Sequence, residues 1–395
     1  MPMFSIVIPT RNRAHLLEYS LQSALHQTFD DYEIVISDNY SSDETRDVVK
    51  KYSHSRIRYF RTDRSLPMHD NWNFALNEAH GKWITFLTDR SIISSSLLEK
   101  ISEVINKDSS PLIGWNHASF ALPTWYEQER LNQLVMPRFT GRTVNMDSRS
   151  QLKRLYRLQL SYGHLPRMMN SACRADLISD IIGQAGRFFL PTAVDHSSCA
   201  AMLSMTDHYQ YIDLPLRISL IGKEGTGGSV EFGQGVSRVD FFKLLGDDSV
   251  PKYVPFKSFF LETNCVAECL LSVKQTMPDH FADIYFNWKQ YFVQCYSDLL
   301  HMKAFGVDVE QEKAEFFQAL GKESLSIKLG VSALIPAIKV STPLRLLLRN
   351  MIFRFPFLAP LVQRHIVSGK AAGFTNPLDA LLYLENFFGG PQKFR

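Results

Sequence analysis

Apolar, strand-like segments alternate with helix-like segments over residues 4–110, and this alternation limits the fold of the chain more than any other feature. The segments 4–9, 33–37, 57–61 and 83–87 are short and apolar, as buried strands are. Strands of this kind, separated by helices, predict a parallel sheet with helices on both faces. Ligands of such sheets bind beyond the carboxyl ends of the strands. We therefore look for functional residues there.

The alternation gives way to other patterns further along the chain. Strands and turns are expected over 112–147, helices over 148–160 and 195–206, and a strand over 209–221. A glycine-rich stretch at 222–235 follows, and the sequence beyond it looks helical, without extended strand alternation. We therefore expect an α/β domain over 1–235 and a helical carboxy-terminal domain over 236–395.

The composition excludes several classes of protein. A net charge of +3, with 45% hydrophobic and 21% charged residues, is typical of a globular chain and not of a disordered one. Basic residues do not cluster with aromatic ones in a recognisable module, so no nucleic acid partner is expected. The five cysteines form no C-x-x-C pair, which indicates reduced thiols. No secretion signal is predicted at the amino terminus.

Three motifs follow one another in the first part of the chain. They are Ser5-Ile-Val-Ile-Pro-Thr-Arg-Asn-Arg13, Ile34-Val-Ile-Ser-Asp-Asn-Tyr-Ser-Ser-Asp43 and Asn71-Trp-Asn-Phe-Ala-Leu-Asn-Glu-Ala-His-Gly81, the last leading into the strand at 83–87. In this order they resemble the family 2 glycosyltransferases, whose amino-terminal domain has the GT-A fold. The resemblance is clear over 4–110, thinner to about 235, and absent beyond.

The resemblance implies a fold and an activity. The fold would be a GT-A type, Rossmann-like and mostly parallel α/β sheet with flanking helices, followed by the helical region. Residues 1–110 would bind the nucleotide and 111–235 the acceptor. The enzyme would move a hexosyl or N-acetylhexosaminyl group, with inversion, from a nucleotide-sugar donor (a UDP-sugar) to a hydroxyl of a surface polysaccharide, lipopolysaccharide or lipid-linked glycan.

Two other hypotheses belong to different classes. A GT-A domain without catalysis could bind a glycan or act as a scaffold in a glycan-assembly complex. A sugar nucleotidyltransferase would carry a glycine-rich phosphate loop after its first strand, and 9–13 contains no glycine. The sugar nucleotidyltransferase hypothesis is therefore disfavoured.

The resemblance also assigns residues to the donor. The carboxylate of Asp38 would accept the N–H of a uracil-like base, and the residues after the first strand would frame the base and the diphosphate. A structural interpretation is that Asp38 and Ser41 cap the following helix. The residues assigned to the nucleotide-sugar are Pro9, Thr10, Arg11, Arg13, Asp38, Ser41, Asn71, Asp89 and Arg90.

The end of the fourth strand departs from the family's pattern. Relatives have two or three aspartates there, which hold Mg²⁺ or Mn²⁺ against the diphosphate, whereas this chain has only Asp89, followed by Arg90. One carboxylate is a poor site for a hard cation. Three interpretations stay open. Arg90 replaces the metal, or Asp89 and the diphosphate hold a weakly bound metal between them, or the domain has lost catalysis.

An inverting transfer needs a carboxylate to take the proton of the acceptor hydroxyl. The segment 191–198 resembles the part of the family that carries this base, so Asp195 is the candidate; it could also cap the helix that follows. Asp176 and Asp180 lie on a predicted helix and are expected to be solvated. For the neighbouring His196, a structural or acceptor-contacting role outweighs a catalytic one.

Two segments outside the motifs suggest further roles. The glycine-rich stretch 222–235 is interpreted as a lid over the donor or as a plain linker. The segment 329–367 combines leucine and phenylalanine with spaced arginines, which suits a helix lying in a membrane interface; the alternative is a buried helix with snorkelling arginines. Charges interrupt it too often for a membrane span. We therefore expect a cytoplasmic protein, peripheral at the inner face of the cell membrane.

Overall fold

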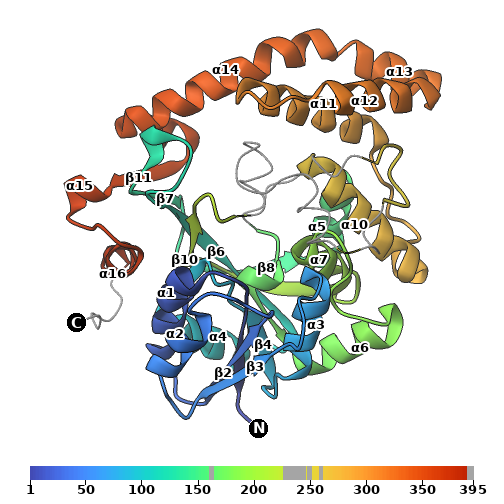
Figure 1. Ribbon diagram of the computed structural model, residues 1–395. Coiled ribbons are helices and arrows are strands. Elements are labelled where there is room, and N and C mark those ends of the chain that lie inside the picture. Colours follow the sequence, from blue (N-terminus) through green and yellow to red (C-terminus); the bar gives the residue numbers. More distant parts are fainter. Residues whose placement is uncertain (160–163, 226–245, 247–250, 258–260, 389–395) are drawn as a thin grey trace.

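The computed structural model describes residues 1–159, 164–225, 246, 251–257 and 261–388 (Figure 1). Its strands are β1 (Phe4–Thr10), β2 (Tyr32–Asp38), β3 (Ile57–Arg61), β4 (Trp83–Phe86), β5 (Ser91–Ile93), β6 (Leu112–Ala121), β7 (Gln133–Pro137), β8 (Thr143–Asp147), β9 (Ser171–Arg174), β10 (His208–Ile221) and β11 (Arg364–Ser368). These join into one sheet of 11 strands, with the main order β11-β7-β6-β9-β4-β1-β2-β3. Strand β10 adds to it by pairing with β5, β6 and β8.

The helices of the α/β part cover this sheet. They are α1 (Ala14–Leu25), α2 (Thr45–Lys51), α3 (Met68–Asn77), α4 (Leu97–Ile105), α5 (Ser148–Tyr156), α6 (Ala175–Ala185) and α7 (Val194–Ser204), with short 3-10 turns η1 (Gln128–Arg130) and η2 (Met168–Asn170). Every residue of β1 is buried, because its side chains alternate between two cores. Ile6 and Ile8 pack with Leu21 of α1, whereas Val7 packs with Trp72 of α3.

The predicted α/β class and the first four strands are confirmed, but the sheet is mixed. Strands β3, β2, β1 and β4 are parallel to one another, and β10 is parallel to β6. The remaining pairs are antiparallel, including β4 with β9 and β9 with β6. The insertion of β9 between β4 and β6 ends the parallel half of the sheet. It was not expected from the sequence.

The carboxy-terminal part is mainly helical, as predicted. It contains α10 (Glu262–Thr276), η4 (Pro278–Phe281), α11 (Trp288–Ala304), α12 (Glu310–Lys322), α13 (Leu325–Ser332), α14 (Ile335–Arg354), η5 (Pro356–Val362), α15 (Gly369–Ala372) and α16 (Pro377–Phe387). Figure 1 shows α11, α12, α13 and α14 as a layer at the end of the molecule remote from the amino terminus.

The last part of the chain returns to the sheet, against the expectation that everything after about 236 is helical. Strand β11 pairs with β7 in antiparallel register, and Leu381 and Leu384 of α16 pack with Leu16 and Ile92. Five residues of strand are too short to stand out by alternation in an apolar and basic segment. The carboxy-terminal segment thus supplies an edge strand and a helix to the α/β part.

No single described helix has the length and apolar composition of a membrane span. Helices α13 and α14 meet those measures only when taken together, as a pair bent by 44°. The interpretation of 329–367 as interfacial stays a prediction.

Candidate active site

The loops after β1 and β2 are joined by hydrogen bonds at the carboxyl edge of the sheet. The Asn39 amide donates to the Thr10 carbonyl (2.9 Å), and the Asn12 amide donates to Ser41 Oγ (2.9 Å). The Asn12 side chain accepts in turn from the Ser42 amide (2.8 Å). Asn12 has a φ of 52°, in the left-handed region that asparagine adopts more readily than most residues. These bonds fix the loop at 10–13 against the loop at 39–42.

Asp38 lies between these loops and is 1% exposed. Its Oδ1 accepts from the Ser41 amide (2.8 Å), and its Oδ2 accepts from the Tyr59 hydroxyl (2.6 Å) and lies 3.4 Å from Arg61 Nε. Burial and the bond to Asp38 raise the pKa of the Tyr59 hydroxyl well above its usual value. Asp38 and Ser41 therefore organise a turn instead of capping α2, which begins at Thr45. A contact of Asp38 with a nucleobase stays a prediction.

Asp89 follows β4 and is 2% exposed. Its Oδ2 accepts from Thr10 Oγ1 (3.0 Å), and both of its oxygens lie 3.3 Å from Arg13 Nη1. Arg13 also donates through Nη2 to the Glu224 carbonyl (2.9 Å). The structure thus brings together three residues that the sequence assigned to the donor, and an internal ion pair neutralises the carboxylate.

The other predicted donor residues lie in different environments. Asn71 is buried and accepts a hydrogen bond from Ser37 Oγ (2.8 Å), which ties α3 to β2. Pro9 is buried in β1, and Arg11 is half-buried in the loop after it. Arg90 is half-buried beside Gly225, where a Cβ would lie 2.6 Å from Arg90 Nη1. Glycine at 225 therefore leaves room for the Arg90 guanidinium.

Asp195 lies in the first turn of α7, between two basic side chains. Its Oδ1 is 3.1 Å from His196 Nδ1, and its Oδ2 accepts from Arg167 Nη1 (3.2 Å). Burial raises the pKa of Asp195, but His196 and Arg167 outweigh it and hold the pKa well below its usual value. The carboxylate is therefore ionised at neutral pH. The position of His196 is that of a residue that orients Asp195.

The two other acidic candidates behave as expected. Asp176 is exposed and pairs with Arg174, and Asp180 is exposed on the same helix, α6.

Sequence reasoning missed three residues that the structure places near the predicted site. Arg217 is 4% exposed on β10, in register with His117 of β6. Burial, then the charges of Arg217 and Arg167, hold the pKa of His117 well below its usual value, so this imidazole is neutral. The signal that could have found Arg217 is a positive charge inside an apolar, alternating strand segment. Arg167 gives no comparable signal, because it lies in an irregular stretch.

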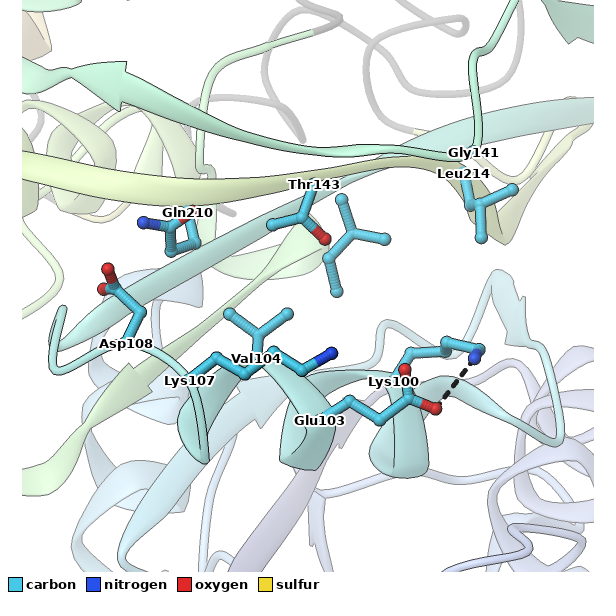
Figure 2. Close-up of a pocket in the computed structure, with 10 residues that line it drawn as sticks. Lys100, Glu103, Val104, Lys107, Asp108, Gly141, Thr143, Gln210 and Leu214 are labelled. Carbon is cyan, nitrogen blue, oxygen red and sulfur yellow. Dashed lines mark hydrogen bonds and ion pairs between the residues drawn. The ribbon is translucent and has the colours of Figure 1, made fainter.

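A cavity of about 350 Å³ lies elsewhere, between α4 and the strands β8 and β10 (Figure 2). None of the predicted site residues lines it. Lys100 and Glu103 on its wall pair with each other (2.8 Å). This cavity therefore has no part in the site described above.

Comparisons with known proteins agree with the motifs and the fold. The family description "Glycosyl transferase family 2" matches residues 5–170. Campylobacter jejuni GalNAc(5)-diNAcBac-PP-undecaprenol beta-1,3-glucosyltransferase is 35% identical over 117 residues, which are 29% of this chain and 38% of the relative. Escherichia coli UDP-Glc:alpha-D-GlcNAc-diphosphoundecaprenol beta-1,3-glucosyltransferase WfgD is 33% identical over 113 residues, which are 28% of this chain and 45% of the relative. The chain thus spans less than half of the length of these relatives.

A solved structure extends the likeness beyond the motifs. The crystal structure of Staphylococcus aureus TarS 1-349 in complex with UDP-GlcNAc has a TM-score of 0.51 and 15% identity, and the match covers 86% of this chain and 88% of that one. At this identity the likeness concerns the fold alone. The resemblance to the family 2 glycosyltransferases is thus confirmed over residues 5–170. Most of the predicted lid at 222–235 lies outside the described residues.

Proposed function

We propose that this chain transfers a sugar from a UDP-sugar to a hydroxyl of a lipid-linked glycan, with inversion at the anomeric carbon. The observation that carries the proposal is the ionised Asp195 carboxylate, which contacts His196 Nδ1 (3.1 Å) and Arg167 Nη1 (3.2 Å) in the first turn of α7. Arg217 is within the electrostatic reach of both Asp195 and Arg90. This supports a base (Asp195) and cationic groups for the leaving diphosphate (Arg90 and Arg217) in one region. The names of the two bacterial relatives support an undecaprenol-linked acceptor, and the TarS complex supports a UDP-sugar donor.

In the proposed reaction the acceptor hydroxyl attacks the anomeric carbon while the bond from that carbon to the diphosphate oxygen breaks. The bonding electrons leave with the nucleoside diphosphate, and the hydroxyl proton passes to Asp195. Ion pairing makes Asp195 a weak base, since it lowers the pKa of the group. A weak base is sufficient if the bond to the leaving group is largely broken before the proton moves, as in oxocarbenium-like transition states.

The test is sugar transfer by the full chain, with UDP-, GDP- and CMP-sugars as donors and polyprenyl-diphosphate-linked saccharides as acceptors. We expect transfer from a UDP-sugar, with the opposite anomeric configuration in the product by NMR. A retained configuration would contradict the inverting mechanism. Transfer by Asp195→Asn at the parent rate would remove Asp195 as the base.

A second candidate function is a GT-A domain that binds a glycan or scaffolds an assembly complex without catalysis. The pairing of Asp89 with Arg13 favours it, because this pairing occupies the carboxylate that a metal would need. Binding of a nucleotide-sugar with no turnover across the whole acceptor panel would support this function over the first.

We further propose that the carboxy-terminal helices hold the enzyme on the inner face of the cell membrane, where a lipid-linked acceptor is found. Large apolar side chains, each between 38% and 80% exposed, follow one another from α13 to η5 and form what we call the α13–η5 face. They are Leu325, Leu329, Leu334, Val340, Leu344, Leu347, Leu348, Met351, Phe355, Phe357, Leu361 and Val362. An exposed apolar stretch of this extent typically marks an interaction site.

The charges around the α13–η5 face support an anionic lipid surface as its partner. Residues 324–378 contain seven lysines and arginines and no aspartate or glutamate. Lys339, Arg345, Arg354 and Arg364 are exposed among the apolar side chains. Basic residues near an anionic bilayer contribute about 1 kcal/mol each, in addition to the burial of apolar side chains.

Sedimentation with vesicles tests this attachment. The full chain should bind vesicles that contain phosphatidylglycerol much more strongly than neutral ones, and Leu344→Gln with Leu347→Gln should weaken the binding at least tenfold. Tyr285→Ser is the control, because Tyr285 is also a large, exposed side chain but lies outside the face. Equal binding by the double variant would contradict the proposal. Resistance to extraction at alkaline pH would instead support a bent span by α13 and α14.

A further inference from the structure

The residues at the end of β4 offer few ligands for the divalent cation that the family implies. Asp89 is the one carboxylate at the end of β4, and both of its oxygens already contact Arg13, with Thr10 as a second donor. The side chain of Glu224, the next acidic residue in this region, accepts from Thr124 (3.1 Å). Within the described ranges no three His, Cys, Asp or Glu side chains form a group that could hold a metal. Because Mg²⁺ and Mn²⁺ need several oxygen ligands, these residues do not fit such an ion.

Two carboxylates whose charges act on Arg90 and Arg217 are already paired with other arginines, Asp89 with Arg13 and Asp195 with Arg167. The Arg217 side chain is buried, and its Nε and Nη2 donate to a neutral partner, Ser91 Oγ, at 3.0 and 2.8 Å. No carboxylate of the described residues pairs with Arg217, and its Nη1 has no hydrogen-bond partner among them. A buried cation that no anion contacts directly is expensive. A ligand that carries negative charge would supply that anion.

Arg90 and Arg217 are linked through Ser91. Ser91 follows Arg90 in the chain and accepts both hydrogen bonds of Arg217, while the Leu220 amide of β10 donates to the Arg90 carbonyl (2.8 Å). Burial, then the nearby charges of Arg167 and Arg90, lower the pKa of Arg217 to about 9. Burial, followed by Arg13, also lowers the pKa of Arg90, although Asp89 and Glu224 act in the opposite direction. The charge of Arg90 thus disfavours the charged form of Arg217, and an anion bound to both would relieve this.

A neutral side chain borders this pair of arginines. His117 lies opposite Arg217 in the strand register, and its buried Nδ1 has no hydrogen-bond partner. Depending on the tautomer, this atom can donate to a ligand or accept from one. The unpaired Nδ1 of His117, next to Arg217, is a second and independent indication that a ligand binds here.

We propose that Arg90 and Arg217 bind the diphosphate of the donor and take over the charge neutralisation that a divalent cation provides in relatives, while Arg13 keeps Asp89 unavailable to metal. This inference rests on the proposed function for the identity of the ligand. As the bond to the anomeric carbon breaks, the leaving diphosphate gains negative charge, and guanidinium groups stabilise that charge by paired N–H···O bonds. Gly225 belongs to this arrangement, because a side chain there would displace Arg90.

Binding of UDP to the full chain, measured by calorimetry with EDTA and with Mn²⁺, tests the inference. We expect dissociation constants within about twofold of each other in the two buffers. In EDTA, Arg90→Gln and Arg217→Gln should each weaken UDP binding at least tenfold. Inorganic pyrophosphate in EDTA should show the same losses, since the diphosphate is the group recognised. Arg142→Gln is the control, because Arg142 is exposed elsewhere on the domain.

Several outcomes would overturn the inference. They are UDP binding that requires Mn²⁺, parent-like binding by both arginine variants in EDTA, and no binding of either probe to the parent. If Arg217→Gln unfolds, Arg217→Lys and Gly225→Ala replace it. The lysine should keep part of the affinity, and the alanine should weaken binding by moving Arg90. UDP binding in EDTA without sugar transfer would support this inference and contradict the proposed function. Sugar transfer that requires Mn²⁺ would support the proposed function and contradict this inference.

Discussion

The side chains at the carboxyl edge of the sheet and those of the α13–η5 face differ in burial and in how they are paired. At the sheet edge, Asp38 and Asp89 are buried and each of their oxygens has a partner. On the α13–η5 face, leucines and phenylalanines are exposed and basic side chains stand among them without any acid in the same segment. The prearranged polar site suits a small anion, which must bind in one orientation. The exposed apolar face suits an extended partner such as an anionic membrane surface, which needs no single orientation.

The largest effect is expected from a substitution in the polar candidate active site. Asp195→Asn keeps the shape of the side chain and removes its charge, so kcat for sugar transfer should fall by about 10²–10⁴ while UDP binding stays close to the parent value. Asp180→Asn, on the exposed surface of α6, is the matched control and should leave kcat unchanged. A loss of UDP affinity that equals the loss of kcat would show that Asp195 acts on the donor and not on the acceptor.

The second effect concerns the attachment of the last helix to the sheet. The carboxylate of Glu385, on α16, accepts from Ser94 Oγ (2.8 Å), from Ser95 Oγ (3.0 Å) and from the Ser95 amide (2.6 Å), just before α4 begins. Glu385→Ala should lower the free energy of unfolding by about 3 kcal/mol, because it leaves buried donors without an acceptor. Glu385→Gln, which keeps the size of the side chain, should lose roughly half as much. Urea unfolding measures both, and equal stability of the alanine variant would contradict this prediction.

A smaller effect is expected where α14 meets the α/β part. Arg349 of α14 pairs with Glu127 (2.8 Å), which also accepts from Arg130 (2.9 Å) and from Trp125 Nε1 (3.1 Å). Arg349→Met keeps the apolar stem and should lower the free energy of unfolding by about 1–2 kcal/mol. Vesicle binding should stay unchanged, since Arg349 lies on the inner side of α14. A loss of vesicle binding at unchanged stability would place Arg349 on the α13–η5 face instead.

The last effect is a pH dependence in the carboxy-terminal helices, which depends on the titration of one buried carboxyl group. Burial raises the pKa of Asp298, on α11, to about 7, although its Oδ2 accepts from the Thr263 amide (3.0 Å). A carboxyl that holds its proton more tightly in the folded state stabilises that state below its unfolded pKa. This stability is lost as the pH rises from about 4 to 7, with a slope of at most about 1.4 kcal/mol per pH unit.

Asp298→Asn removes this titration, so its unfolding free energy should depend less on pH between 4 and 7 than that of the parent. Urea unfolding at several pH values is the measurement. Asp308→Asn, at an exposed position after α11, is the control. Parallel curves for the parent and Asp298→Asn would mean that Asp298 is ionised in the folded protein.

Much of the parallel half could be predicted from the sequence. Strands β1, β2 and β4 are buried on both faces, so their sequences are largely apolar runs that differ clearly from the helices between them. Thr10, Arg13 and Asp89 were assigned to one site because they lie at or after strand ends and match the family's donor-binding positions, and the structure brings them together. The ion pair between Arg13 and Asp89 could not be predicted from their spacing in the sequence.

The antiparallel half was less predictable for a physical reason. Strands β9 and β11 have four and five residues, and such short segments carry too few side chains to show a period of two. Their place in the sheet depends on partners from distant segments, as in the pairing of β11 with β7.

The sequence by itself determined the α/β class, the family motifs and the acidic residues that carry the proposed chemistry, because apolar periodicity and strand ends are local properties. Only the tertiary structure decided which charges meet. Arg13 reaches Asp89 across 76 positions, Arg167 reaches Asp195 across 28, and Glu385 reaches Ser95 across 290. The free energy of such a pair depends on distance and burial after folding, and neither quantity is written in the order of the residues.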